Sequence, residues 1–141
     1  MVLSGRLALV TGGGSGIGRA VCQVLARDNA RVVVADLNID SCKHTEKVGS
    51  YHETLSSSLV NIPQDLRPDD HYSVATDVSQ SDSVSECFQR VLEKYKRPPD
   101  IIVNSAGITK DGFLLRMKEE DFDQVMDVNL KGTFLVTQVG Y

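Results

Sequence analysis

Short apolar runs alternate along the chain with segments of helical periodicity. The runs cover residues 6–11, 31–35, 72–76 and 100–104, and each has the length and composition of a strand buried on both faces. Between them, apolar residues recur at the i, i+3, i+4 spacing of amphipathic helices. This alternation predicts an α/β protein with a parallel sheet. Two stripes are clear, namely Ile17, Ala20, Val21, Val24 and Leu25, then Val84, Cys87, Phe88, Val91, Leu92 and Tyr95.

The remaining segments are less regular. Residues 38–48 are compatible with a helix, whereas residues 50–70 combine serines, two prolines and several charges and predict a long surface excursion. A last helix is expected from Lys118 almost to the end, with apolar residues on more than one face. Such a helix is buried on two sides, so we expect the sheet and something else to cover it. Its apolar residues are Phe122, Val125, Met126, Leu130, Phe134 and Val136.

A glycine-rich octet lies between the first strand and the first helix. It reads Thr11-Gly12-Gly13-Gly14-Ser15-Gly16-Ile17-Gly18. A strand that leads through glycines into a helix directs backbone N–H groups at an anion. Glycine is needed because a Cβ atom would block the approach of a pyrophosphate and would disfavour positive φ in the turn. Such octets also occur in flexible loops, but the placement between strand and helix favours anion binding.

An aspartate, Asp36, ends the second run and follows Gly16 by 20 residues. This spacing is close to that at which an acidic side chain binds the adenosine ribose of a dinucleotide. The alternatives are a solvated aspartate at a strand end or an N-cap for the next helix. Because the octet precedes it, we favour the ribose-binding interpretation.

Composition and charge narrow the possible functions. The 141 residues are about one domain, and 41% hydrophobic and 24% charged residues are typical of a globular protein. A net charge of −4 gives no electrostatic case for binding nucleic acid or an anionic membrane. No apolar run is long enough to span a membrane, and no targeting segment is evident before the first strand.

Cysteines and histidines are few and scattered. Without a C-x-x-C pair, the odd number of cysteines predicts reduced thiols, and we expect Cys22 and Cys87 in the core. The histidines lack metal-ligand spacing, so we expect them to be solvated and expect no metal site. The residues are Cys22, Cys42 and Cys87, and His44, His52 and His71.

Four motifs in order make the sequence resemble the short-chain dehydrogenase/reductase family over nearly its whole length. The octet fits that family's T-G-x-x-x-G-x-G rather than G-x-G-x-x-G. Asp77-Val78 follows the third strand, Asn104-Ser105-Ala106-Gly107 resembles the family's N-N-A-G, and Asn129 lies in the last helix. The resemblance implies a Rossmann-type doubly wound parallel sheet, truncated after the fourth strand and its following helix. Residues 1–141 would then form an incomplete NAD-binding domain.

The resemblance also implies roles for individual residues. Asp77 would accept a hydrogen bond from the adenine amine, the backbone N–H of Val78 would meet a ring nitrogen, and Asn129 would support a water of a proton relay. Local chemistry leaves alternatives: Asp77 or Ser79 as a helix cap, a simple turn after the fourth strand, and Asn129 as a polar residue satisfying a backbone group. The implied cofactor-binding residues are Thr11, Gly12, Gly14, Ser15, Gly16, Ile17, Gly18, Asp36, Leu37, Asp77, Val78, Asn104, Ala106 and Gly107.

Charge at the second strand's end predicts the form of the cofactor. Asp36 would repel the 2′-phosphate of NADP, and Gly14 and Ser15 offer no basic side chain to receive it. Leu37 and Asn38 add no cation. We therefore expect NAD rather than NADP.

Residues 104–109 and 128–134 resemble one branch of the family most, that of the 3-oxoacyl-carrier-protein reductases and a related 17-beta-hydroxysteroid dehydrogenase. This likeness implies reduction of 3-oxoacyl thioesters or oxidation of steroids, within fatty acid or steroid metabolism. It also implies a homo- or hetero-tetramer in the mitochondrial matrix, or otherwise in the cytoplasm.

The family's catalytic serine and Tyr-x-x-x-Lys pair follow the fifth strand. No tyrosine of this sequence has a lysine four positions later. We therefore expect the chain to be the amino-terminal part of a dehydrogenase, either a truncated product or an incomplete gene model. Two function classes stay open: an NAD-dependent oxidoreductase in the intact parent, or a catalytically inactive dinucleotide-binding or interaction fragment.

Overall fold

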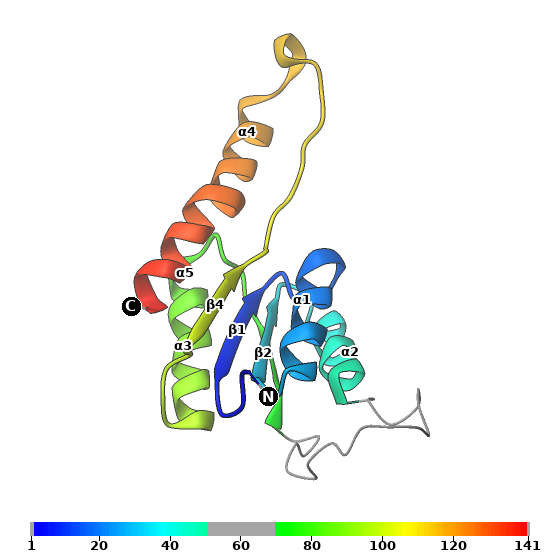
Figure 1. The fold of residues 1–141 in the computed structure, drawn as a ribbon. Helices are drawn as coiled ribbons and strands as arrows, with labels where there is room; N and C mark the ends of the chain where they lie inside the picture. The colour runs from blue at the N-terminus through cyan, green and yellow to red at the C-terminus, as the bar shows by residue number, and fades with distance from the viewer. Residues whose placement is uncertain (1, 51–69, 141) are drawn as a thin grey trace, which may run out of the picture.

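Four parallel strands form one sheet in the computed structural model, which describes residues 2–50 and 70–140. The strands are β1 (Leu7–Thr11), β2 (Arg31–Asp36), β3 (Tyr72–Ala75) and β4 (Ile101–Asn104). Their order is β3-β2-β1-β4, and every neighbouring pair is parallel, so all four carboxyl ends lie at the same edge (Figure 1). This architecture confirms the predicted α/β class and the Rossmann-type order.

Helices cover both faces of the sheet (Figure 1). One face packs against α1 (Gly16–Arg27) and α2 (Ile39–Ser50), and the other against α3 (Ser81–Tyr95) and α5 (Gly132–Gly140). The central strand β1 is buried along its whole length and contributes to both cores, because successive side chains of a strand point to opposite faces. Leu7 and Leu9 belong to the core under α3 and α5, and Val10 to the core under α1 and α2.

Helix α1 packs through small residues, and the stripe predicted for it is partly wrong. A Cβ atom on Gly18 would overlap the carbonyl oxygen of Gly12, so the helix lies too close to the strand for large side chains. The buried residues are Gly18, Cys22 and Ala26. The exposed members of the predicted stripe are Ile17, Ala20 and Val24, while Val21 and Leu25 are half-buried.

The stripe predicted for α3 is confirmed except at one position. Its buried residues are Val84, Cys87, Phe88 and Val91. Leu92 is exposed, and Tyr95 packs at the edge of the core. The helix ends at Lys96, which adopts a left-handed φ of 57°, just before Pro98.

The chain after β4 leaves the sheet and returns through three helical segments. A turn of 3-10 helix (Leu114–Arg116) precedes α4 (Glu119–Met126), a π-helical turn (Asp127–Lys131) follows, and α5 then packs on the sheet. In Figure 1, α4 projects beyond the sheet. Val136 is buried, whereas Phe122, Leu130 and Phe134 are exposed. The sheet thus covers one side of these helical segments, and the expectation that something else covers their other apolar side stays a prediction.

Strand β4 pairs with β1 only, and its start is tied to the start of that strand. The Asp100 carboxylate accepts a hydrogen bond from the Leu7 N–H at 2.8 Å and pairs with Arg6 at 3.1 Å and Arg97 at 2.9 Å. The pKa of Asp100 lies below its usual value, mainly because its carboxylate accepts the Leu7 N–H and, to a smaller extent, because Arg6 and Arg97 lie beside it. The other edge of β4 has no strand partner within the described residues.

His71 is buried, which corrects the expectation of solvated histidines. Its Nδ1 accepts a hydrogen bond from the Val32 N–H at 3.1 Å, and burial lowers its pKa although Glu46 and Asp70 oppose this. His71 is therefore neutral, with its proton on Nε2. His44 is exposed as expected, and all three cysteines are buried free thiols. His52 and nearly all of the predicted 50–70 excursion lie outside the described residues.

Candidate functional site

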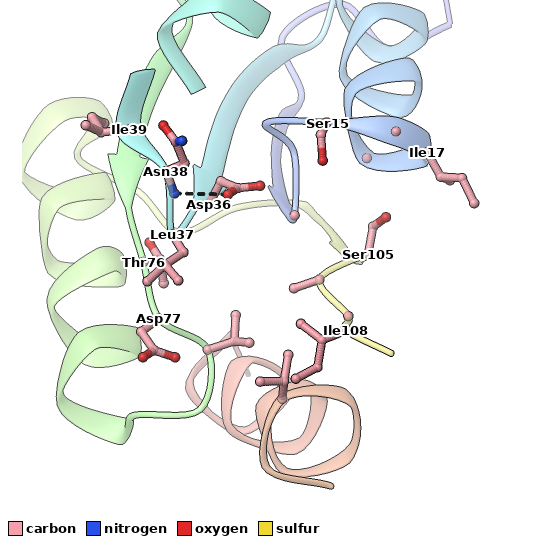
Figure 2. Close-up of a pocket in the computed structure, with 17 residues that line it drawn as sticks. Ser15, Ile17, Asp36, Leu37, Asn38, Ile39, Thr76, Asp77, Ser105 and Ile108 are labelled. Carbon is pink, nitrogen blue, oxygen red and sulfur yellow. Dashed lines mark hydrogen bonds between the residues drawn. The ribbon is translucent and has the colours of Figure 1, made fainter. Parts of the chain in front are cut away.

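A cleft of about 870 Å³ opens at the carboxyl ends of the four strands. In open α/β sheets, ligands bind in the crevice at this edge. Figure 2 shows Ser15 and Ile17 on one side of the cleft, Asp36 and Leu37 at the end of β2, and Ile108 beside the last helical segments. Most of the predicted cofactor-binding residues line it: Gly12, Ser15, Gly16, Ile17, Gly18, Asp36, Leu37, Asp77, Val78, Ala106 and Gly107. Thr11, Gly14, Asn104 and Asn129 do not.

The glycine turn forms the floor of the cleft with its backbone. Gly12 and Gly16 have φ values of 65° and 50°, which side chains disfavour. A Cβ atom on Gly12 would lie 2.7 Å from the Cα atom of Ala106, whereas one on Gly16 would meet no atom within 4 Å. The turn is therefore tightly packed below and open toward the cleft, as a cradle for a ligand's pyrophosphate requires.

Asp36 enters the cleft from the end of β2 with its carboxylate fixed by two backbone donors. Its Oδ2 accepts the N–H of Gly14 and its Oδ1 that of Asn38, both at 3.0 Å (Figure 2 draws the latter). The helix-cap alternative for Asp36 is wrong, because Asn38 Oδ1 accepts the N–H groups of Asp40 and Ser41 in the first turn of α2. Gly14 lies beneath the carboxylate rather than in the cleft.

Asp77 lies across the cleft, in the turn after β3. Its Oδ1 accepts the N–H and the hydroxyl of Ser79 at 3.0 and 2.7 Å, and Oδ2 accepts no hydrogen bond from the residues that the structure describes. The helix-cap alternative is wrong here too, because Gln80 is the N-cap of α3. The adjacent Val78 is buried and packs on α5 near Gly132.

Thr11, a predicted residue outside the cleft, holds the loop after β4 in place. Thr11 is fully buried, and its hydroxyl accepts the N–H groups of Ser105 and Ala106 at 3.3 and 3.4 Å. Asn104 instead donates to the Thr137 hydroxyl of α5 at 3.2 Å. Thr11 therefore positions the loop rather than lining the cleft.

Asn129 lies in the π-helical turn and pairs with one residue of the same loop. Its Oδ1 accepts the Ile108 N–H at 2.9 Å, and its Nδ2 donates to the Ile108 carbonyl at 3.0 Å. These bonds agree with the alternative that Asn129 satisfies backbone groups. Its part in a proton relay stays a prediction.

Sequence reasoning missed several lining residues. They are Asn38, Ile39, Thr76, Ser105, Ile108 and Val128. Four of them, Asn38, Thr76, Ser105 and Ile108, directly adjoin predicted residues after the strands, so adjacency would have found them, and Ile39 follows Asn38. Val128 reaches the cleft only through the tertiary packing of the π-helical turn.

The lining of the cleft offers groups suited to binding a ligand. It provides backbone N–H groups for an anion and two carboxylates for hydroxyl or amine groups, and among the described residues it includes no Lys, Arg, His, Tyr or Cys. Burial raises the pKa of the nearby Cys22 and Cys42 thiols to about 12, so neither supplies a thiolate. The described residues contain no cluster fit for a metal ion and no helix able to cross a membrane.

A family model for the short chain dehydrogenases matches residues 6–141. The chain belongs to this family. The (3R)-3-hydroxyacyl-CoA dehydrogenase of Mus musculus is 44% identical over 137 residues, which are 96% of this chain and 49% of that protein. The 3-oxoacyl-[acyl-carrier-protein] reductase FabG of Thermotoga maritima is 37% identical, over 99% of this chain and 50% of that protein.

The structural match agrees with the family. A short-chain type dehydrogenase/reductase from Mycobacterium marinum superposes with a TM-score of 0.81 at 27% identity, covering 98% of this chain and 49% of that one. This short-chain dehydrogenase sequence thus spans about half the length of the relatives it matches. Family members typically use a nicotinamide dinucleotide, and the open glycine turn with the fixed Asp36 carboxylate fits such a cofactor.

Proposed function

We propose that the chain is the NAD-binding part of a short-chain oxidoreductase. The observation that carries this proposal is the pairing of Asp36 with the N–H of Gly14, because it places a rigid carboxylate beside the glycine turn that begins α1. The adenosine ribose would bind Asp36 and the pyrophosphate the N–H groups at the start of α1. Asp77 and Val78 would receive the adenine, and the Ala106–Gly107 backbone the other half of the dinucleotide.

The same carboxylate supports NAD over NADP. Two backbone donors hold Asp36, so it cannot turn away from a 2′-phosphate without losing both bonds. No cationic side chain of the part of the chain that the structure describes lines the cleft to neutralise that phosphate. A dianion here would meet like charge at close range.

The bound nicotinamide would supply the hydride chemistry. This chain's own residues would bind and orient the cofactor: Asp36 fixes the ribose, the glycine turn the pyrophosphate, and Thr11 the loop after β4. Asn129 holds the same loop through Ile108. These 141 residues thus supply the binding and orienting parts of the reaction.

The relatives support a substrate class for the whole protein. Their printed names refer to 3-hydroxyacyl-CoA and 3-oxoacyl-[acyl-carrier-protein], so we infer interconversion of 3-oxoacyl and 3-hydroxyacyl thioesters. Oxidation of hydroxysteroids follows only from the likeness to 17-beta-hydroxysteroid dehydrogenase type 8. A tetramer and a mitochondrial matrix location rest on the same likeness.

The cofactor proposal is tested by titrating the chain with NADH and NADPH and following nicotinamide fluorescence. We expect NADH to bind at least about tenfold more tightly, because one charge repulsion of this kind exceeds 1.4 kcal/mol. Tighter binding of NADPH would reverse the cofactor assignment. Binding of neither would overturn the proposed site.

The 141 residues alone should not turn over substrate, as the inactive-fragment alternative also requires. A tyrosine acts as general acid only when a neighbouring cation lowers its pKa, and no Tyr-x-x-x-Lys pair is present. The test is NADH oxidation with an acetoacetyl thioester, with NADH binding as the control for a folded site. A rate near that of FabG from Thermotoga maritima would contradict this expectation.

A further inference from the structure

We propose that Arg19 is a positioning residue that aims the N–H of Ser15 at the pyrophosphate of the dinucleotide. This inference rests on the proposed cofactor site. Arg19 lies in the first turn of α1, and its own side chain does not line the cleft. It acts through the glycine turn.

The Arg19 guanidinium joins the glycine turn to two helices. One terminal nitrogen donates to the Gly14 carbonyl, and Nε donates to the Thr45 hydroxyl of α2 at 3.1 Å. Thr45 is fully buried and donates to the Ser41 carbonyl at 3.1 Å, so the anchor on α2 is itself fixed. The guanidinium is held at both ends.

Gly14 is therefore fixed on both sides of its Cα atom. Its N–H donates to Asp36 Oδ2 at 3.0 Å, and its carbonyl accepts from Arg19. In a trans planar peptide, the carbonyl of one residue and the N–H of the next point in opposite directions. Arg19 holds the Gly14 oxygen and thereby directs the Ser15 N–H to the opposite side of that peptide.

The turn needs this restraint because of its composition. Three consecutive glycines precede Ser15, and glycine adopts many backbone conformations at little cost. A flip of the peptide between Gly14 and Ser15 would change ψ of Gly14, which glycine tolerates, and would turn φ of Ser15 from −154° to a positive value, which a serine adopts at some cost. The hydrogen bond from Arg19 adds to this preference of Ser15 in holding the peptide. An arginine suits the task because its planar fork reaches two acceptors at once, which a lysine ammonium on a flexible stem does less well.

The test compares ADP with adenosine, because only ADP carries the pyrophosphate. Both are titrated into the ¹⁵N-labelled chain, and the dissociation constants and the Ser15 amide signal are followed for the wild type, R19M, R19K and T45V. R27M is the matched control, since Arg27 lies on the same helix, is largely exposed and pairs with the neighbouring Asp28 at 3.9 Å. Melting temperatures are recorded for every variant.

We expect R19M to weaken ADP binding by about tenfold, the worth of one aligned charge-assisted hydrogen bond. Adenosine binding should stay within about twofold, as should both ligands with R27M. The Ser15 amide should shift on ADP binding in the wild type and not in R19M. T45V should also lose affinity for ADP but not for adenosine, by a smaller factor than R19M. R19K should resemble R19M.

Other outcomes overturn the inference. An equal loss of ADP and adenosine in R19M would indicate general destabilisation, and full ADP affinity in R19K would mean that charge alone suffices. If R19M does not fold, T45V provides the test. An equal loss of affinity for ADP and adenosine in T45V would contradict the positioning role of Arg19. If the wild type and R19M bind ADP equally well, the positioning role of Arg19 is overturned and the cofactor site stands. A wild type that binds neither ligand overturns the cofactor site and the role of Arg19 together.

Discussion

In the proposed cofactor site, Asp36 would decide between NAD and NADP, because two backbone donors fix the orientation of its carboxylate. Asp36→Ala should narrow the preference for NADH over NADPH by about tenfold, since the repulsion of the 2′-phosphate is lost. Asp36→Asn keeps an oxygen that accepts the Gly14 N–H, removes the charge and replaces the acceptor of the Asn38 N–H by an amide NH2 group. It should narrow the preference equally, as measured by paired fluorescence titrations. An unchanged ratio in both variants would show that Asp36 does not face the ribose.

His71 makes the stability of the fold depend on pH. Its pKa in the folded chain lies below the ordinary 6.5 because of burial, and Lys94 lowers it further while Glu46 and Asp70 oppose this. The unfolded chain therefore binds more protons below pH 6.5, and the free energy of unfolding falls as pH decreases through that range. The slope contributed by one group is at most about 1.4 kcal/mol per pH unit.

Urea unfolding between pH 7.5 and 5.5 measures this effect. In His71→Asn, an amide oxygen replaces Nδ1 as acceptor for the Val32 N–H, and the titration is removed, so the pH slope should shrink. His44→Asn is the matched control, because His44 is exposed and should leave the slope unchanged. Equal slopes in the wild type and His71→Asn would refute this role of His71.

Single residues were predictable from the sequence where their position along a strand decides their place. Asp36 ends β2 and Asp77 lies in the turn after β3, and parallel strands bring such positions together, so the cleft follows from topology. His71 was not predictable, since its partner is a backbone N–H 39 residues away. The hydrogen bonds of Asn129 to Ile108 likewise depend on a loop whose path no local pattern specifies.

At the scale of elements, the packing of α1 depends on one glycine. Gly18→Ala would force a methyl group against the Gly12 carbonyl and should lower the free energy of unfolding by about 1–3 kcal/mol. Gly112→Ala is the control, because a Cβ atom there meets nothing within 4 Å. Chemical denaturation of both variants measures the difference. A Gly18→Ala chain as stable as Gly112→Ala would contradict the close approach of helix and strand.

Periodicity predicted which segments are helices better than which faces they bury. It succeeded for α3, whose predicted residues are buried except for the exposed Leu92 and the partly buried Tyr95. For α1 it selected Ile17 and Val24, which are exposed, because the close approach at Gly18 admits only small side chains. It also gave no sign of the π-helical turn at Asp127–Lys131, because one extra residue per turn leaves no mark in an apolar pattern.

At the scale of the whole molecule, two apolar surfaces remain open. The outer edge of β4 has no strand partner among the described residues, and Phe122, Leu130 and Phe134 are exposed on the last helical segments. Unpaired edges template association with other chains, and each large apolar side chain left exposed forgoes about 1.5–3 kcal/mol. We therefore expect the 141-residue chain to self-associate.

Sedimentation velocity and thermal melting test this expectation. Ile101→Lys puts a charge on the β4 edge and should reduce association. Val2→Lys makes the same change of charge at a remote, exposed residue and should not. A wild-type chain that is a soluble monomer with a cooperative melt would mean that the four strands suffice without further pairing.

The strand order also sets a sequence of events during synthesis. β1 pairs with β2 within the first 36 residues, but its other neighbour is β4, whose Asp100 accepts the Leu7 N–H 93 residues away. At about 5–20 residues per second, the ribosome needs roughly 3–14 seconds to pass from β2 to β4. During that interval the Gly14 N–H can already bind the Asp36 carboxylate, while the edge of β1 that later pairs with β4 is still unpaired. A nascent chain would thus fix the Asp36 carboxylate before both neighbours of its central strand β1 are in place, and a chaperone that shields β1 would be needed only in that window.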